Sequence, residues 1–154
     1  MICMITEARP QGCTSFKVRQ LMRRISQHYD TEVAQSGLKT TQYSLLSHVM
    51  SLGPLRPVDL ADAMKMTAST LSRNLQPLIA AGWLTMGEGA DGRSRLVHIT
   101  ESGLAKRREG QKYWKVAQQK LNDQLGVERV LALHTLIDDA MVLLGPEAAI
   151  EADA

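Results

Sequence analysis

The sequence predicts a mainly α-helical protein with one small β-hairpin. Three observations lead to this fold class. Apolar residues recur at the three- and four-residue spacing of amphipathic helices over most of the chain. Near the middle, a glycine-rich segment separates two apolar or β-branched runs, which is typical of a hairpin. Just before that segment, two short helical patterns are joined by a tight turn, so a helix-turn-helix followed by a β wing is expected.

Length and composition favour one compact domain over residues 1–154. The chain has 154 residues, 44% of them hydrophobic, and a net charge of +2, which is too small to indicate a nucleic-acid partner by itself. Cys3 and Cys13 have no histidine beside them, so neither a zinc site nor a disulfide framework is expected. No apolar stretch approaches the ~18 residues of a membrane span. We therefore expect a soluble cytoplasmic protein that is neither exported nor membrane-bound.

The first two helices are predicted from their apolar stripes and their stops. The segment from Thr14 to Gln35 carries an apolar stripe and ends at Gly37. A second helix is expected over Thr41 to Leu52, because Lys39-Thr40-Thr41 offers a cap and Gly53-Pro54 ends the pattern. Its expected buried residues are Tyr43, Leu46, Val49 and Met50.

The helix-turn-helix and hairpin come next in the chain. Pro57 to Met64 is expected to form a two-turn helix with proline at its first position. Thr67 can cap a helix that runs to Ala81 and stops at Gly82. The runs Trp83 to Met86 and Arg95 to Ile99 then bracket glycines at a hairpin tip, so Gly87 to Arg95 is the expected wing.

Two further helices complete the predicted order. Thr100 is expected to cap a long helix that ends at Leu125, before Gly126. Val127 to Leu144 forms the last helix, and its apolar residues exceed what one buried face of a monomer needs. We therefore predict a helical dimerisation part at 13–36 and 101–145, around a winged helix-turn-helix at 41–100.

The helix from Thr67 to Gly82 has one apolar and one polar face. Ser69, Ser72, Arg73 and Gln76 share the polar face, and their side chains suit a helix in a major groove of DNA. Their neighbours Thr70 and Asn74 are included in the expected contact set. Arg93 and Arg95 flank the hairpin tip and could enter the adjacent minor groove. Asp91 is expected to orient the guanidinium of Arg93 and to belong to the same set.

These patterns resemble the MarR family of bacterial regulators from about Phe16 to Leu144. The resemblance is carried by ordered segments along the chain, namely Gly37 to Tyr43, Asp59-Leu60-Ala61, Ser69 to Arg73, Gly82-Trp83-Leu84, and Asp91 to Ser94 followed by Leu96, Ile99-Thr100 and Gly103. It implies a homodimer with helix 1 and the last two helices at its interface. It further implies a palindromic DNA site, and repression relieved by a small aromatic ligand.

Two positions depart from the family's pattern. Pro77 lies inside the expected recognition helix, where it removes the hydrogen bond to the carbonyl of Arg73 and should kink the axis. Arg56 stands before Pro57 where the family usually has a threonine or serine cap, so a weaker start of the short helix is expected.

The same resemblance suggests an effector site and a thiol sensor. A small aromatic acid would suit cations and a phenol, and the candidates are Arg19, Arg23, His28, Tyr43 and His48. These residues could equally form interface or phosphate contacts. Cys13, near the start of helix 1 with Lys17 one turn away, is the candidate for oxidant sensing, with an inert thiol as the alternative. No metal site and no cofactor are expected, because the histidines are scattered.

Other function classes fit the sequence less well. We expect no enzymatic activity, because the sequence has no nucleophile motif and no phosphate-binding glycine loop. A winged helix used only for contacts with other proteins is the stronger alternative to DNA binding. That alternative predicts a surface without convergent cations, whereas Arg73, Arg93 and Arg95 are expected to converge.

Overall fold

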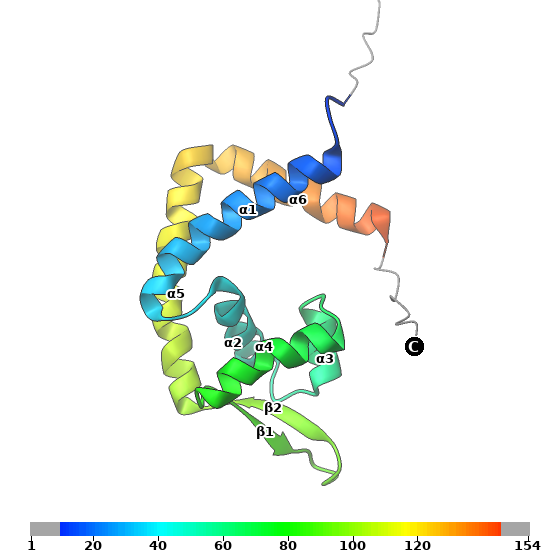
Figure 1. Cartoon of the computed structure of the whole chain (residues 1–154), viewed down its shortest axis with the longest axis vertical. Helices are drawn as coiled ribbons and strands as arrows, with labels where there is room; N and C mark the ends of the chain where they lie inside the picture. The colour runs from blue at the N-terminus through cyan, green and yellow to red at the C-terminus, as the bar shows by residue number, and fades with distance from the viewer. Residues whose placement is uncertain (1–9, 146–154) are drawn as a thin grey trace, which may run out of the picture. The chain divides into compact units, whose positions relative to one another are not determined.

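The computed structural model describes residues 10–145 and contains the predicted order of helices and strands (Figure 1). The elements are α1 (Thr14–Val33), the 3-10 helix η1 (Ala34–Ser36), α2 (Thr40–Leu52), α3 (Pro57–Ala63), α4 (Ala68–Ala80), β1 (Leu84–Glu88), β2 (Arg95–Ile99), α5 (Glu101–Leu125) and α6 (Val127–Leu144). Contacts divide the chain into two units at Ala117 and Gln118. The first unit therefore holds the helix-turn-helix, the hairpin and α1. Cys3 lies outside the described residues.

The core of the first unit is built from α2, α3, α4 and the hairpin. Its buried side chains are Val33, Leu38, Tyr43, Leu45, Leu46, Val49, Leu60, Ala61, Leu71, Leu75, Leu78, Leu84 and Val97. One expectation for α2 was wrong, because Met50 is 38% exposed while Leu45 is 1% exposed. Successive helix residues are about 100° apart, so the face centred on Leu45, Leu46 and Val49 leaves Met50 beyond its edge.

Helix α2 begins at Thr40, with Lys39 of the expected capping run as its N-cap residue. The Gln42 side chain reaches back to accept a hydrogen bond from the Lys39 N–H at 2.9 Å. Asp30, near the end of α1, accepts the Thr40 N–H at 2.9 Å. Two N–H groups at the helix start thus gain partners, and one of these bonds ties α2 to α1.

Helix α4 begins at the predicted cap. Thr67 precedes the helix with extended backbone, and its Oγ1 accepts the Thr70 N–H at 3.2 Å. Leu71, Leu75 and Leu78 face the core. The helix continues through Pro77 to Ala80, and Gly82 follows it with a φ of +77°. Glycine suits this left-handed position because it lacks a Cβ.

The hairpin pairs β1 with β2 in antiparallel register. Leu84 lies opposite Ile99, Met86 opposite Val97, and Glu88 opposite Arg95. Strand β1 runs two residues further than expected, through Gly87 and Glu88. Leu55, which precedes α3, adds a bridge to Val97 on the other side of β2. The hairpin is thus anchored to the helix-turn-helix, and its tip extends beyond α3 and α4 (Figure 1).

The junction between hairpin and α5 is closely packed. Thr100 caps α5 as predicted, since its Oγ1 accepts the Gly103 N–H at 3.0 Å. The same hydroxyl donates to the Gly82 carbonyl at 2.6 Å, and Ser102 donates to that carbonyl at 3.0 Å. A Cβ on Gly103 would collide with the Trp83 carbonyl oxygen. The end of α4, the start of β1 and the start of α5 therefore share one set of contacts.

The second unit consists of the end of α5 and α6. Gly126 separates the two helices with a φ of +83°, and Gly145 follows α6 with a φ of +73°. Helix α6 exposes large apolar side chains, namely Leu131, Leu136, Ile137, Met141, Val142, Leu143 and Leu144. Between residues 10 and 145, none of the helices has the length and apolarity required to cross a membrane.

Candidate nucleic-acid interface

Helix α4 presents a polar face to solvent. Ser69, Ser72, Arg73 and Gln76 are all exposed, whereas the leucines of the opposite face are buried. These four side chains lie within two turns and contain the one charged residue of the helix, Arg73. The face therefore has hydrogen-bonding groups of several lengths and a guanidinium, all accessible to a partner.

Two residues of the expected contact set are engaged inside the protein. Thr70 is half-buried, and its Oγ1 accepts a hydrogen bond from the Thr67 hydroxyl at 2.9 Å. Asn74 is also half-buried, and its Nδ2 donates to the sulfur of Met66 at 3.6 Å. These contacts stabilise the turn between α3 and α4, so the exposed face narrows to Ser69, Ser72, Arg73 and Gln76.

The tip of the wing is a tight turn held by Asp91. Its Oδ1 accepts the backbone N–H groups of Arg93 at 3.1 Å and Ser94 at 2.9 Å, and its Oδ2 accepts the Ser94 hydroxyl at 2.7 Å. The hydrogen bonds from Ser94 and Arg93 lower the pKa of Asp91 to about 2. The hydrogen bonds of Asp91 are thus made to the backbone of Arg93 and to Ser94, whereas the sequence analysis expected this carboxylate to orient the Arg93 guanidinium.

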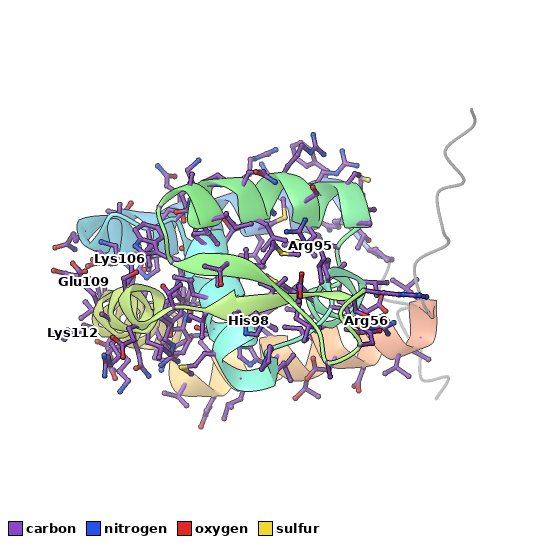
Figure 2. The ribbon with its side chains drawn as sticks, turned by 90° about the horizontal axis from the view of Figure 1, so that it is seen from below. Arg56, Arg95, His98, Lys106, Glu109 and Lys112 are labelled. Carbon is purple, nitrogen blue, oxygen red and sulfur yellow. The ribbon has the colours of Figure 1, made fainter. Side chains whose placement is uncertain are left out.

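The two wing arginines occupy different positions. Arg93 lies in the turn, next to Gly92, and is exposed. Arg95 begins β2 and shares a face of the hairpin with Val97, since alternate residues of a strand point the same way. Val97 is fully buried in the core that contains α4, and Figure 2 shows Arg95 on the α4 side of the hairpin and His98 on the other. Arg93 is therefore at the tip of the wing, and Arg95 is on the face of the hairpin next to α4.

An ion pair fixes the beginning of α3. The guanidinium of Arg56 donates to both carboxylate oxygens of Asp59, at 2.8 and 3.0 Å. The hydrogen bond with Asp59 raises the pKa of Arg56, and the same bond lowers the pKa of Asp59. No side-chain cap hydrogen bond forms at Arg56. The carboxylate in the first turn still complements the positive end of the helix dipole. Figure 2 shows Arg56 on the surface beside α3.

Comparisons with known proteins show what this chain is similar to. The model of the MarR family matches residues 36–94. The HTH-type transcriptional regulator YwoH of Bacillus subtilis is 26% identical over 93 residues, which are 60% of this chain and 68% of that protein. The multiple antibiotic resistance protein MarR of Salmonella typhimurium is 26% identical over 140 residues, which are 87% of this chain and 92% of that protein. Over residues 36–94, this chain therefore resembles the MarR family.

A solved structure of the family has the same fold. A mutant of MarR from E. coli, crystallised with operator DNA, superposes with a TM-score of 0.76 at 18% identity, covering 82% of this chain and 92% of that chain. The mainly helical fold with a two-stranded hairpin is thus confirmed as a MarR-type winged helix-turn-helix. The family is one of transcriptional regulators, which agrees with the class predicted from the sequence.

Some effector candidates lie in an aromatic cluster. Tyr43 is buried and stacks on Trp114 with 6.2 Å between ring centroids. The ring centroid of Tyr29 lies 6.5 Å from that of Trp114. Arg107 lies 5.7 Å from the Tyr43 ring centroid and donates to the Ser47 hydroxyl at 3.2 Å. His28 pairs with the Ala117 carbonyl at 2.8 Å. Burial raises the pKa of Tyr29.

Arg107 is the residue of this cluster that the sequence analysis missed. It lies far along the chain from Tyr43 and Ser47, on the charged stretch of α5. Such a stretch ordinarily indicates a solvated face. The available signal was the spacing of Arg107 and Trp114. They are seven positions apart, so they share one face of the helix.

The remaining candidates lie outside this cluster of contacts. Arg19 and Arg23 are exposed on α1. His48 pairs with the Ser44 carbonyl of its own helix at 2.8 Å. Cys13 is exposed immediately before α1, with a free thiol. Across residues 10–145, no group of three or more histidine, cysteine or acidic side chains could hold a metal ion.

Proposed function

We propose that this chain is a MarR-family repressor that binds a palindromic operator as a homodimer. The exposed polar face of α4, next to a wing whose turn is held by Asp91, is the observation that carries this proposal. A helix of this composition suits the major groove, and Arg93 suits the narrower minor groove beside it. The operator complex of E. coli MarR, which shares the fold, supports the proposal.

Exposed apolar surface supports the homodimer. Helix α6 leaves Leu143 86% exposed and Leu144 83% exposed, and helix α1 exposes Phe16, Val18, Leu21 and Met22. Apolar surface of this extent marks an interaction site in soluble proteins. A two-fold dimer would cover these faces and would carry two recognition helices, which suits a palindrome with half-sites about 34 Å apart. In this proposal, residues 13–36 and 101–145 form the dimerisation part and 41–100 the DNA-binding part.

We propose a small aromatic acid as the effector that relieves repression. Arg107 supplies a cation beside the ring of Tyr43, and a carboxylate could replace its present partners Ser47 and Gln111. Ligand binding at Arg107 would shift α5, which directly follows β2, and α2, which contacts β2. In a thermal-shift screen with benzoate-type acids, binding raises the unfolding temperature of the wild type, and Arg107→Met abolishes that rise. Stabilisation that survives in Arg107→Met would contradict this site.

The experiment for DNA binding is a titration of duplex DNA at several salt concentrations. The natural probe is a labelled duplex of the promoter region beside the gene, and its binding is measured by fluorescence anisotropy. A chain that releases counterions from DNA phosphates loses affinity steeply as salt rises. A winged helix that contacts only other proteins would show no such slope. Arg93→Ala should weaken binding while the unfolding temperature stays that of the wild type, and an unchanged affinity at fixed salt would refute the role of the wing.

A further inference from the structure

The exposed face of α4 contains side chains of unequal power to read bases. Ser69 and Ser72 have short hydroxyls, which accept or donate with little preference, and Ser69 already lies 3.3 Å from the Thr67 hydroxyl. Thr70 and Asn74 are half-buried, and each already has a hydrogen-bond partner within the protein. Arg73 and Gln76 remain as the exposed residues with planar, two-pronged hydrogen-bonding groups. Base discrimination by this helix therefore depends on these two side chains.

The chemistry of the two groups points to different bases. A guanidinium donates two hydrogen bonds to O6 and N7 of guanine, whereas a glutamine amide pairs with N6 and N7 of adenine. Glutamine cannot reproduce the two donors that guanine requires, because its amide offers one donor side and one acceptor side. Arg73 is the one charged residue of α4, so this helix can read one guanine in each half-site in this way.

The spacing of the two side chains limits how far apart their bases lie. Residues three apart on a helix rise about 4.5 Å along its axis, with Cβ atoms roughly 5–6 Å apart. Base pairs in B-DNA are stacked at about 3.4 Å intervals. Two side chains at this separation reach base pairs that are neighbours or are separated by one step.

We propose that each operator half-site presents a guanine to Arg73 and, within two base pairs of it, an adenine to Gln76. This inference rests on the proposed function, because it assumes that α4 lies in a major groove. It adds which bases α4 recognises and which side chains determine that choice. The exposed apolar positions Pro77 and Ala80 follow on the same helix and add no hydrogen-bonding preference of their own.

The inference is tested by selecting duplexes from a random-sequence pool with the full wild-type chain. The expected consensus has a guanine and an adenine at this spacing in both half-sites. Exchange variants then assign the bases. Arg73→Gln should change the selected guanine to adenine, and Gln76→Arg should change the selected adenine to guanine. Replacing either selected base in a fixed duplex should weaken wild-type binding by roughly 5- to 150-fold, the range for one bidentate contact.

A matched control separates base reading from charge. Arg108→Gln makes the same chemical change at an exposed residue of α5, so it should leave the selected consensus unchanged. Arg73 and Gln76 are exposed, so the unfolding temperatures of the exchange variants should match the wild type. Duplexes with 7-deazaguanine at the selected guanine test the contact in the wild-type chain without any substitution, and binding should weaken.

The outcomes distinguish this inference from the proposed function. A specific consensus that keeps the same bases in both exchange variants would overturn the inference, because Arg73 would then contact phosphate, while DNA binding would stand. Full binding to 7-deazaguanine duplexes would overturn it as well. No enrichment of any sequence by the wild-type chain, with no salt-dependent binding, would overturn both.

Discussion

Replacing Gly103 by alanine should destabilise the chain at the junction between hairpin and α5. The added Cβ would collide with the Trp83 carbonyl oxygen and would lie 2.9 Å from Cγ1 of Ile99. A backbone carbonyl cannot rotate away as a side chain does, so the start of α5 must move. Such overpacking costs about 1–3 kcal/mol. The Thr100 cap on the Gly103 N–H would be strained too, which costs about 1 kcal/mol.

Alanine also favours helix over glycine by about 1 kcal/mol, which offsets part of this loss. The net destabilisation is therefore about 2 kcal/mol, and the melting temperature of a chain this size should fall by roughly 4–8 °C. Thermal unfolding followed by circular dichroism measures both variant and wild type. Gly110→Ala is the matched control in the same helix. Its Cβ would meet side-chain atoms of Tyr43 and Leu38, at 2.9 and 3.0 Å, rather than a backbone carbonyl, so it should destabilise the chain less than Gly103→Ala does. A Gly103→Ala chain as stable as the wild type, or more stable than Gly110→Ala, would refute this reasoning.

Three further predictions concern the wing, the dimer and the thiol. Asp91→Ala should weaken DNA binding through a loosened turn, and Asp91→Asn should retain more affinity because its amide oxygen still accepts the N–H groups of the turn; equal losses in both variants, measured by anisotropy, would argue against this role. The depressed pKa near 2 means that the carboxylate stabilises the turn above its ordinary value of 3.8 and loses this effect as the pH falls through about 2, so the turn should not change between pH 5 and 8. Leu136→Glu, on the exposed face of α6, should give a monomer in light scattering, while α4 and the wing keep their fold. A dimer of unchanged mass would exclude this face of α6 from the dimer interface. Cys13→Ser should abolish peroxide-induced release from DNA if the exposed thiol is a sensor, and release retained by this variant would exclude the thiol.

Helix boundaries were predictable where the signals are local. Thr67 caps α4, Thr100 caps α5, and Gly126 separates α5 from α6, as the sequence predicted. Each of these features depends on a residue and its neighbours within one turn. The same local chemistry identified the polar face of α4. Local patterns thus sufficed for the order of elements and for most of the candidate interface.

The missed features depend on competing partners or on distant residues. Asp91 had both a guanidinium and backbone amides within reach, and the sequence could not decide that the amides of the turn would take it. Thr70 and Asn74 each adjoin a residue of the exposed face, Ser69 and Arg73 respectively. They are nevertheless half-buried, and they contact Thr67 and Met66. The packing of Arg107 on Tyr43 joins two helices far apart in the chain. Spacing along one helix carries no information about such pairs.

Hydroxyl-radical footprinting of the wild-type chain on its selected operator tests the central claim most directly. A homodimer that reads DNA with α4 and the wing should protect two patches whose centres lie about one helical turn, or a multiple of it, apart and are related by two-fold symmetry. Arg93→Ala should reduce protection at the minor-groove edge of both patches equally. A single asymmetric patch, or uniform protection along the duplex, would contradict the account.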